Sequence, residues 1–401
     1  MTDKQIYATE EKCCGCEACV NICPKNAISM QAGTLGSLLP VIDSSLCVEC
    51  GLCRKVCQYH TKPIFHSVAK VYVAANTDEP ALKNSASGGV FFAIAESFVA
   101  NSGVVYGCTM ECQDDKLSAF HTRVSTKDGL KRLQGSKYVQ SEIKETYKSV
   151  KIDLEKGKLV LFSGTPCQIG GLKSFLMHRE YDNLYTMDLI CHGVPSNQFF
   201  QAYLEYREKK MKCKIREYSF RDKSIGWGLV AKMVFRTDSG KQKTMIIPDK
   251  LSSYYNLFLR GLIYRNSCYQ CMYAQEKRVS DITIGDYWGI ESEHPELLKE
   301  NGGSISVKKG VSCILVNSEK GEVLLNNYGK KLKVYSSAFE KASRKNKQLN
   351  APMPLNKALR EKIIHDYASG YCTVERNYFK KMGFKMYIYA LYYKMKQYIH
   401  I

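Results

Sequence analysis

Eight cysteines near the start of the chain have the type and spacing to hold iron–sulfur clusters. They form two runs that both read C-x2-C-x2-C-x3-C, and Pro24 follows the first run. With this spacing, three thiolates of one short loop ligate a cubic [4Fe–4S] cluster, and the fourth cysteine ligates a neighbouring cluster. The sequence therefore predicts two [4Fe–4S] clusters, each completed by a cysteine of the other run. The first ligand set is Cys13, Cys16, Cys19 and Cys57, and the second ligand set is Cys47, Cys50, Cys53 and Cys23.

Structural zinc and a disulfide framework both fit these cysteines less well. Structural zinc usually takes two short Cys/His pairs across a longer spacer, which two identical four-cysteine runs do not resemble. A disulfide framework requires an exported chain, whereas residues 1–5 contain no apolar signal core. We therefore expect a reduced, metal-loaded protein of the cytoplasm. Cys14, inside the first run, matches no ligand position and is expected to be a bystander.

A second group of cysteines lies where short strands are predicted to end. Two single cysteines follow the β-rich runs at residues 159–163 and 184–190, and a C-x2-C pair lies further on. The alternation of strands and helices indicates an α/β layer, and such sheets bind ligands at the carboxyl ends of their strands. Spacing alone leaves these cysteines open between a shared metal site and separate packing roles. The third cysteine set is Cys167, Cys191, Cys268 and Cys271.

A run of small residues precedes a predicted apolar helix over residues 91–99. This Ser-Gly-Gly run consists of Ser87, Gly88 and Gly89. Open backbone N–H groups at a helix start suit a phosphate group, although the same residues are also typical of a simple helix cap. Neither a G-x-x-x-x-G-K-[ST] motif nor a G-x-G-x-x-G motif after a strand is present, so a standard P-loop or Rossmann site is not predicted.

Six motifs follow one another in the larger part of the chain. They are Ser87-Gly88-Gly89-Val90, Gly135-Ser136-Lys137-Tyr138-Val139-Gln140, Gly164-Thr165-Pro166-Cys167-Gln168, Cys191-His192-Gly193, Cys268-x-x-Cys271 and Ser280-Asp281-Ile282-Thr283-Ile284-Gly285-Asp286. In this order they resemble the beta subunits of coenzyme F420 hydrogenases and dehydrogenases, an FAD-containing iron–sulfur family. The resemblance implies that the third cysteine set holds a third [4Fe–4S] cluster.

The resemblance also implies FAD, bound without a Rossmann fingerprint. The Ser-Gly-Gly run would approach the pyrophosphate through backbone N–H groups. Lys137, Tyr138 and Gln140 would lie near the flavin, where a cation stabilises the anionic reduced ring, although Lys137 is also typical of a solvated loop charge. Motif position makes His192 and Asp286 the acid–base candidates. Their alternative roles are to orient a cluster loop and to form a turn.

Clusters and a flavin together predict an FAD-dependent iron–sulfur oxidoreductase. Such a protein couples one-electron transfer through [4Fe–4S] clusters to two-electron chemistry at FAD. The expected partners are a redox partner, either a ferredoxin-like or a deazaflavin donor, and a small-molecule substrate. Members of the family that occur beside surface-polysaccharide genes suggest a polysaccharide-pathway substrate. The alternative is a non-catalytic electron-transfer subunit of a larger F420- or ferredoxin-linked hydrogenase or dehydrogenase complex.

The formal net charge of +19 is concentrated outside the cysteine runs. Residues 1–60 carry five Lys/Arg and six Asp/Glu, a net −1, so the remainder carries 19 − (−1) = +20. After Glu375 the sequence contains six Lys/Arg, no acidic residue and many aromatics. Such a tail can contact an anionic membrane surface at the inner face, or it can dock on the protein's own core. No nucleic-acid partner is expected, because no recognition motif accompanies the charge.

These observations predict the fold class and its division. We expect an α+β ferredoxin-like N-terminal module, then a larger α/β flavin-binding domain with a mixed sheet, and finally a mostly helical C-terminal tail. The expected boundaries are residues 1–62 for the two-cluster ferredoxin domain, 68–312 for the FAD and iron–sulfur domain, and 313–401 for the helical basic extension. No apolar run approaches the ~20 residues that a membrane-spanning helix requires.

Overall fold

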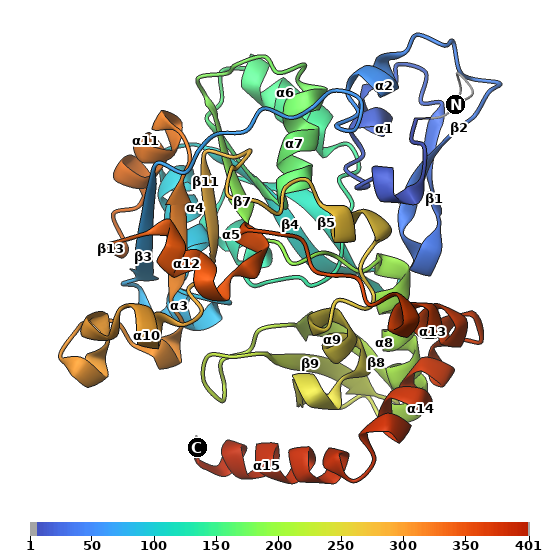
Figure 1. The fold of residues 1–401 in the computed structure, drawn as a ribbon, viewed down its shortest axis with the longest axis vertical. Helices are drawn as coiled ribbons and strands as arrows, with labels where there is room; N and C mark the ends of the chain where they lie inside the picture. The colour runs from blue at the N-terminus through green and yellow to red at the C-terminus, as the bar shows by residue number, and fades with distance from the viewer. Residues whose placement is uncertain (1–5, 400–401) are drawn as a thin grey trace.

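A computed structural model describes residues 6–399 of the 401-residue chain. Its largest element is a mixed sheet of eight strands (Figure 1). The four strands β11, β7, β6 and β4 run parallel to one another, and the outer strands pair antiparallel. This is the mixed sheet that the sequence predicts. In spatial order the strands are β13 (Leu332–Ser337), β3 (Lys70–Asn76), β12 (Ser312–Val316), β11 (Ile282–Asp286), β7 (Leu184–Leu189), β6 (Val160–Gly164), β4 (Val104–Gln113) and β5 (Lys116–Val124).

Helices cover both faces of this sheet because both faces are apolar. Successive strand residues point to opposite faces, and Val104 and Val105 of β4 accordingly belong to two different hydrophobic clusters. One face packs against α4 (Val90–Ala100), α5 (Lys127–Leu133) and α11 (Glu319–Tyr328). The other packs against α6 (Thr146–Glu155), α7 (Pro166–Phe175) and α12 (Phe339–Lys345). Two short helices, α3 (Glu79–Asn84) and α10 (Ile290–Glu293), follow β3 and β11.

A smaller antiparallel sheet lies beside the edge of the large one (Figure 1). It is made of β8 (Cys213–Ser219), β9 (Val230–Thr237) and β10 (Gln242–Pro248), and the chain reaches it between β7 and β11. Its core is rich in aromatic rings, including the fully buried Phe199, Phe200 and Tyr254. The surrounding helices are α8 (Asn197–Met211), α9 (Ser253–Leu259), α13 (Lys357–Ala368) and α14 (Tyr371–Met382).

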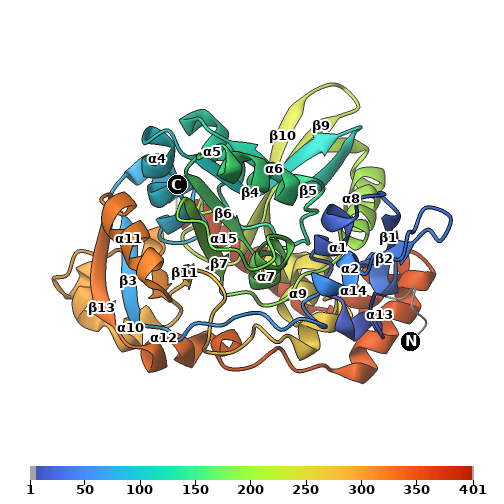
Figure 2. The ribbon, with the colours of Figure 1, turned by 90° about the horizontal axis from the view of Figure 1, so that it is seen from above.

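The N-terminal module is small and lies against α6 and α7, as Figure 2 shows from above. It contains the hairpin β1 (Ile28–Ala32) and β2 (Leu38–Ile42) and the short helices α1 (Ala18–Ile22) and α2 (Leu52–Lys55). In both cysteine loops the residues flanking the middle cysteine have positive φ angles, Gly15 and Glu17 in one and Glu49 and Gly51 in the other. The sequence repeat is thus also a repeat of backbone conformation.

The large sheet extends beyond residue 312, where the sequence predicts a domain boundary. Strand β12 crosses that position, and β13 pairs with β3 at the edge of the sheet. Strand β13 escapes sequence detection because it is an edge strand with only partly buried residues. The helical part of the tail begins with α12 and ends with α15 (Lys385–Ile399). Within residues 6–399, no helix has the length and apolar character needed to cross a membrane.

Candidate iron–sulfur and flavin site

The first ligand set surrounds one cavity in the N-terminal module. Cys13, Cys16, Cys19 and Cys57 all line it, together with Lys12, Met30 and Pro40, and the cavity measures about 380 Å³. Burial, followed by the charges of Cys16 and Cys13, raises the pKa of Cys57 to about 11. Thiols that are crowded and desolvated in this way deprotonate most readily when they bind a cation, because the metal compensates the thiolate charge. The structure therefore brings together the four cysteines that the sequence assigns to one cluster.

The second ligand set lies at the surface of the module. Cys50 is exposed and Cys47 and Cys53 are half-buried, while Cys23 and Cys53 pack on the small core around Ile28. Burial, then the charges of Cys47 and Cys50, raise the pKa of Cys53. The second set is thus the outer of the two sets.

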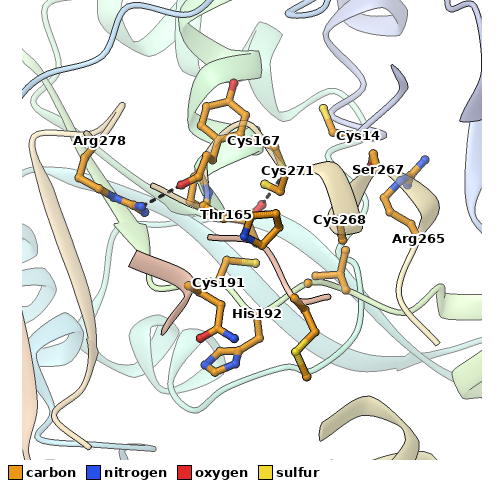
Figure 3. A pocket seen from close by; sticks show the side chains of 18 of the residues that line it. Cys14, Thr165, Cys167, Cys191, His192, Arg265, Ser267, Cys268, Cys271 and Arg278 are labelled. Atoms are coloured by element: carbon orange, nitrogen blue, oxygen red, sulfur yellow. Dashed lines mark hydrogen bonds between the residues drawn. The ribbon is translucent and has the colours of Figure 1, made fainter. Parts of the chain in front are cut away.

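The third cysteine set lines a cavity at the carboxyl edge of the large sheet (Figure 3). Cys167 follows β6 and Cys191 follows β7, as predicted, and these parallel neighbours end on the same side. Cys268 and Cys271 come from the segment after α9 and face them across a cavity of about 630 Å³, counted to its open mouth. Burial raises the pKa of Cys268 to about 12 and that of Cys271 to about 11. Four thiols from three chain segments around one space fit a thiolate-ligated cluster in donor type and number.

Cys14 and Gln58 lie between the first ligand set and the third cysteine set. Cys14 lines both cavities, and the neighbouring thiols of Cys16 and Cys167, a member of each set, raise its pKa well above the ordinary value. The contact with Cys14 is the main reason why the pKa of Cys167 falls to about 7. Gln58 is buried, and its Nε2 donates to the Cys167 carbonyl at 2.9 Å and contacts Cys14 Sγ at 3.7 Å. Cys14, which the sequence predicts to be a bystander, therefore lies where the two cavities meet.

Arg265 fastens the N-terminal module to the rest of the protein. Its guanidinium is 1% exposed and donates to the carbonyl oxygens of Cys13 (3.2 Å) and Leu38 (2.7 Å) and to Oε1 of Gln140 (2.5 Å). Glu17 adds a second attachment, because its carboxylate accepts from the backbone N–H groups of residues 143 and 144, both at 2.9 Å. Burial raises the pKa of Glu17 to about 7. Arg265 belongs to no motif, and Glu17 occupies one of the variable positions of the first cysteine run, so sequence reasoning missed both.

The Ser-Gly-Gly run packs tightly against the large sheet before α4. Gly88 N donates to Ser312 Oγ at 2.9 Å, and Ser87 Oγ donates to the Val311 carbonyl at 2.8 Å. A Cβ atom on Gly88 would lie 2.5 Å from the Ala74 carbonyl oxygen, so no larger residue fits there. Gly89 has φ = 76° and precedes the first turn of α4. These contacts explain the glycines by packing, and a pyrophosphate contact stays a prediction.

The three residues predicted near a flavin point in different directions. Lys137 Nζ donates to the carbonyls of residues 132, 133 and 134 at the end of α5, and burial lowers its pKa to about 8. Gln140 instead supports the first cysteine loop, since its Nε2 donates to the Gly15 carbonyl at 3.0 Å. Tyr138 stacks on Phe258 with ring centroids 4.5 Å apart. Of these three residues, only Tyr138 contacts the group around Asp286, because its hydroxyl accepts a hydrogen bond from Arg221.

Asp286, at the end of β11, is held by a buried arginine and a tryptophan. Arg221 forms a bidentate ion pair with it, with N–O distances of 2.8 and 3.2 Å, and also donates to the Tyr138 hydroxyl. Trp227 Nε1 donates to Asp286 at 3.2 Å, and its ring stacks on Trp288 at 4.7 Å between centroids. Both tryptophans of the chain therefore lie at this ion pair, with Trp227 bonded to the carboxylate and Trp288 stacked against the guanidinium of Arg221. Arg221 and the Trp pair are further polar-site candidates that the motifs did not reveal.

His192 and Lys223 complete the surroundings of Asp286. His192 lines the cavity of the third cysteine set. Desolvation lowers its pKa, and the negative charge of Asp286 opposes this effect without reversing it. Lys223 Nζ donates to the carbonyls of Leu82, Ser87 and Lys309 at 2.6–2.8 Å, which ties the Ser-Gly-Gly run to the loop after β8. The two predicted acid–base residues thus lie in one region, between the third cysteine set and the Ser-Gly-Gly run.

Known families account for the two main parts of this arrangement. Residues 12–61 match the 4Fe-4S dicluster domain, and residues 157–342 match the C terminus of the coenzyme F420 hydrogenase/dehydrogenase beta subunit. The chain therefore carries the C-terminal domain of that beta-subunit family behind an N-terminal dicluster domain. This confirms the resemblance inferred from the six motifs. The dicluster match also confirms the prediction of iron–sulfur clusters in the N-terminal module, and the protein is an iron–sulfur electron-transfer protein related to the F420 hydrogenase beta subunit.

Comparison with individual proteins adds little to the family assignment. A chain of the F420-reducing [NiFe] hydrogenase complex from Methanosarcina barkeri, solved as a xenon derivative, is similar at 14% sequence identity. The match covers 76% of this chain and 94% of that chain, with a TM-score of 0.43. No curated protein matches the sequence.

Proposed function

We propose that this protein couples one-electron transfer through three [4Fe–4S] clusters to two-electron chemistry at FAD. Clusters exchange single electrons, and a flavin exchanges either one electron or two. The observation that carries the proposal is the junction at Cys14. Cys14 lines both the cavity of the first ligand set and the cavity of the third cysteine set, so the two cavities share a wall. A short separation between redox centres is what electron transfer between them requires.

The three cysteine sets form a sequence from the surface inward. The second ligand set includes the exposed Cys50, the first ligand set is less exposed, and the third cysteine set lies at the edge of the large sheet. Gln58 and Tyr273 fill the junction between the inner two sets: both are buried, and the Tyr273 hydroxyl donates to Gln58. Of these two side chains, Gln58 contacts the Cys14 thiol directly, at 3.7 Å. The proposed role of the N-terminal module is therefore to receive electrons at the surface and deliver them inward.

We propose that the region around Asp286 holds the flavin. Arg221 and Lys223 supply positive charge, the Ser-Gly-Gly run lies beside Lys223, and Tyr138 contacts Arg221. The backbone N–H of Gly88 is directed to Ser312, and the ammonium of Lys223 is directed to three carbonyls, so Gly89 is the better candidate to hold a phosphate. His192 would hold or move a proton at its imidazole, and Asp286 would keep Arg221 in position.

The substrate and redox partner belong to the same proposal. A polysaccharide-pathway intermediate or another small molecule as substrate, and a ferredoxin-like protein or deazaflavin as donor, rest on the family resemblance. One structural observation favours the alternative role as a non-catalytic electron-transfer subunit. Leu46 and Val48 beside the second ligand set are 51% and 56% exposed, which makes this loop a contact surface for a partner protein.

Anaerobic purification followed by quantification of iron, sulfide and flavin tests this proposal. Three clusters correspond to about twelve irons per chain and two clusters to about eight, and one FAD per chain is expected. The Cys14→Ser variant should retain the iron but slow reduction of the inner cluster when reduced ferredoxin is the donor. A preparation with about eight irons and no flavin would refute the proposal. Substrate turnover by the single chain would separate the enzyme from the non-catalytic subunit.

A further inference from the structure

The C-terminal helix α15 presents a row of apolar side chains to solvent. Phe384, directly before the helix, is 76% exposed, and Leu391 and Met395 are 61% and 57% exposed. Tyr387, Ile388 and Tyr392 are also more than half exposed. In Figure 1 the helix lies along the lower edge of the molecule, beside the smaller sheet. The apolar stripe is defined as Phe384, Tyr387, Ile388, Leu391, Tyr392 and Met395.

The opposite face of α15 is the one that contacts the protein. Met386, Tyr389 and Tyr393 are the less exposed positions of the helix up to residue 395. The Tyr393 hydroxyl donates to the Asp249 carboxylate at 3.2 Å, which fixes the helix to the turn before α9. At 3.6 residues per turn, the helical members of the apolar stripe span an arc of about 140° directly opposite this contact face. The helix is therefore held with its apolar stripe turned away from the body.

Positive charge flanks the apolar stripe on both sides. By the same helical geometry, Lys385 lies at one border of the arc and Lys394 at the other. Both side chains are exposed. The sequence after Glu375 contains six Lys/Arg and no acidic residue, so nothing acidic in this segment offsets the charge. An apolar stripe bordered by lysines, with tyrosines at its edges, is typical of helices that lie in the headgroup region of a bilayer.

We propose that α15 docks this protein on an anionic lipid surface. The apolar stripe would enter the boundary between headgroups and acyl chains, and Lys385 and Lys394 would contact lipid phosphates. Charge favours lipid over a second copy of the chain. Two stripes packed face to face would bring two clusters of lysines together in a protein whose net charge is already +19. This inference does not depend on the proposed flavin chemistry.

Cosedimentation of the full-length, cluster-loaded protein with lipid vesicles tests the proposal. The protein should bind phosphatidylglycerol-containing vesicles and not vesicles of phosphatidylcholine alone. Combining Ile388→Asp with Leu391→Asp should weaken binding at least about tenfold, because two buried apolar side chains are lost. Replacing Lys385 and Lys394 by Gln should weaken binding about fivefold per lysine at low salt.

Matched controls make the outcome decisive. Ile152→Asp with Val323→Asp adds the same charge at exposed apolar positions of α6 and α11, and this pair should bind about as well as the wild type. Equal iron content and circular dichroism would show that all variants fold. Failure of the wild type to bind anionic vesicles would overturn the proposal, as would equal loss in the control pair. Sedimentation velocity could instead show a wild-type dimer that is lost only in the Ile388/Leu391 variant. If that variant still bound vesicles, the apolar stripe would be a self-association surface.

Discussion

Replacing Arg265 by alanine should release the N-terminal module from the large sheet. The Arg265 guanidinium joins the first cysteine loop, the β1–β2 hairpin and the motif segment at Gln140. A Cβ on Gly15 would lie 2.2 Å from its Nη1, so the loop and the guanidinium fit against each other closely. Without the side chain, the carbonyls of Cys13 and Leu38 lose their donor inside the interface. The change should loosen the module while leaving both sheets folded.

The free energy that Arg265 contributes to docking of the module can be worked from its three hydrogen bonds. Each hydrogen bond from a charged donor contributes about 1.5–3 kcal/mol, so three contribute about 4.5–9 kcal/mol. Desolvation of the buried guanidinium offsets several kcal/mol of this sum. A net loss of about 3–4 kcal/mol is expected, which raises the undocked population about 100- to 1,000-fold.

Hydrogen exchange of the anaerobic holoprotein measures this change. Amides of residues 28–42 should exchange faster in the Arg265→Ala variant, while amides of β6 and β7 keep their protection. Arg278→Lys is the control, because Arg278 is also buried but its side chain bonds to strands β7 and β11 and to the carbonyls of Tyr273 and Gln275, and not to the described residues of the N-terminal module. Unchanged exchange at residues 28–42, or equal acceleration in the control, would refute the role assigned to Arg265.

Three further predictions concern packing, pH and metal content. Gly171→Val should lower the free energy of unfolding by about 1–3 kcal/mol through overpacking, because a Cβ at this position would lie 2.9 Å from Cys16 Cβ. Thermal unfolding measures this loss of stability. Burial lowers the pKa of His121 to about 4, so the unfolded chain binds its proton first as pH falls. Stability should therefore drop by up to about 3 kcal/mol between about pH 6.5 and pH 4, and His121→Gln should lose this part of the pH dependence. Cys268→Ser should lower the iron content from about twelve to about eight per chain.

Each of these has a matched comparison. Gly228→Val places the same side chain in open space and should leave the unfolding temperature nearly unchanged. For His121, equal acid sensitivity of the wild type and the glutamine variant would show that other groups cause the loss. Cys372→Ser alters an exposed cysteine and should retain all of the iron. If Cys268→Ser also retains it, the third cysteine set does not hold a cluster.

The sequence by itself determined the parts whose information is local. The spacing of the eight N-terminal cysteines indicated two clusters, because each loop carries three ligands within seven residues. Strand and helix patterns predicted the mixed α/β sheet. Six short motifs were enough to indicate the family. Each of these signals lies within a few turns of helix or one strand, where side-chain period and spacing reflect structure directly.

Only the tertiary structure decided how these parts meet. Cys14 and Cys167 line one cavity although more than 150 residues of chain separate them, and Arg265 bonds to Cys13 across 252 residues. Gln140, predicted beside a flavin, instead supports a cysteine loop, and β13 joins the sheet at its edge without an alternating pattern. Long-range contacts leave no periodic trace in the sequence, because they depend on which surfaces bury one another once the chain is folded.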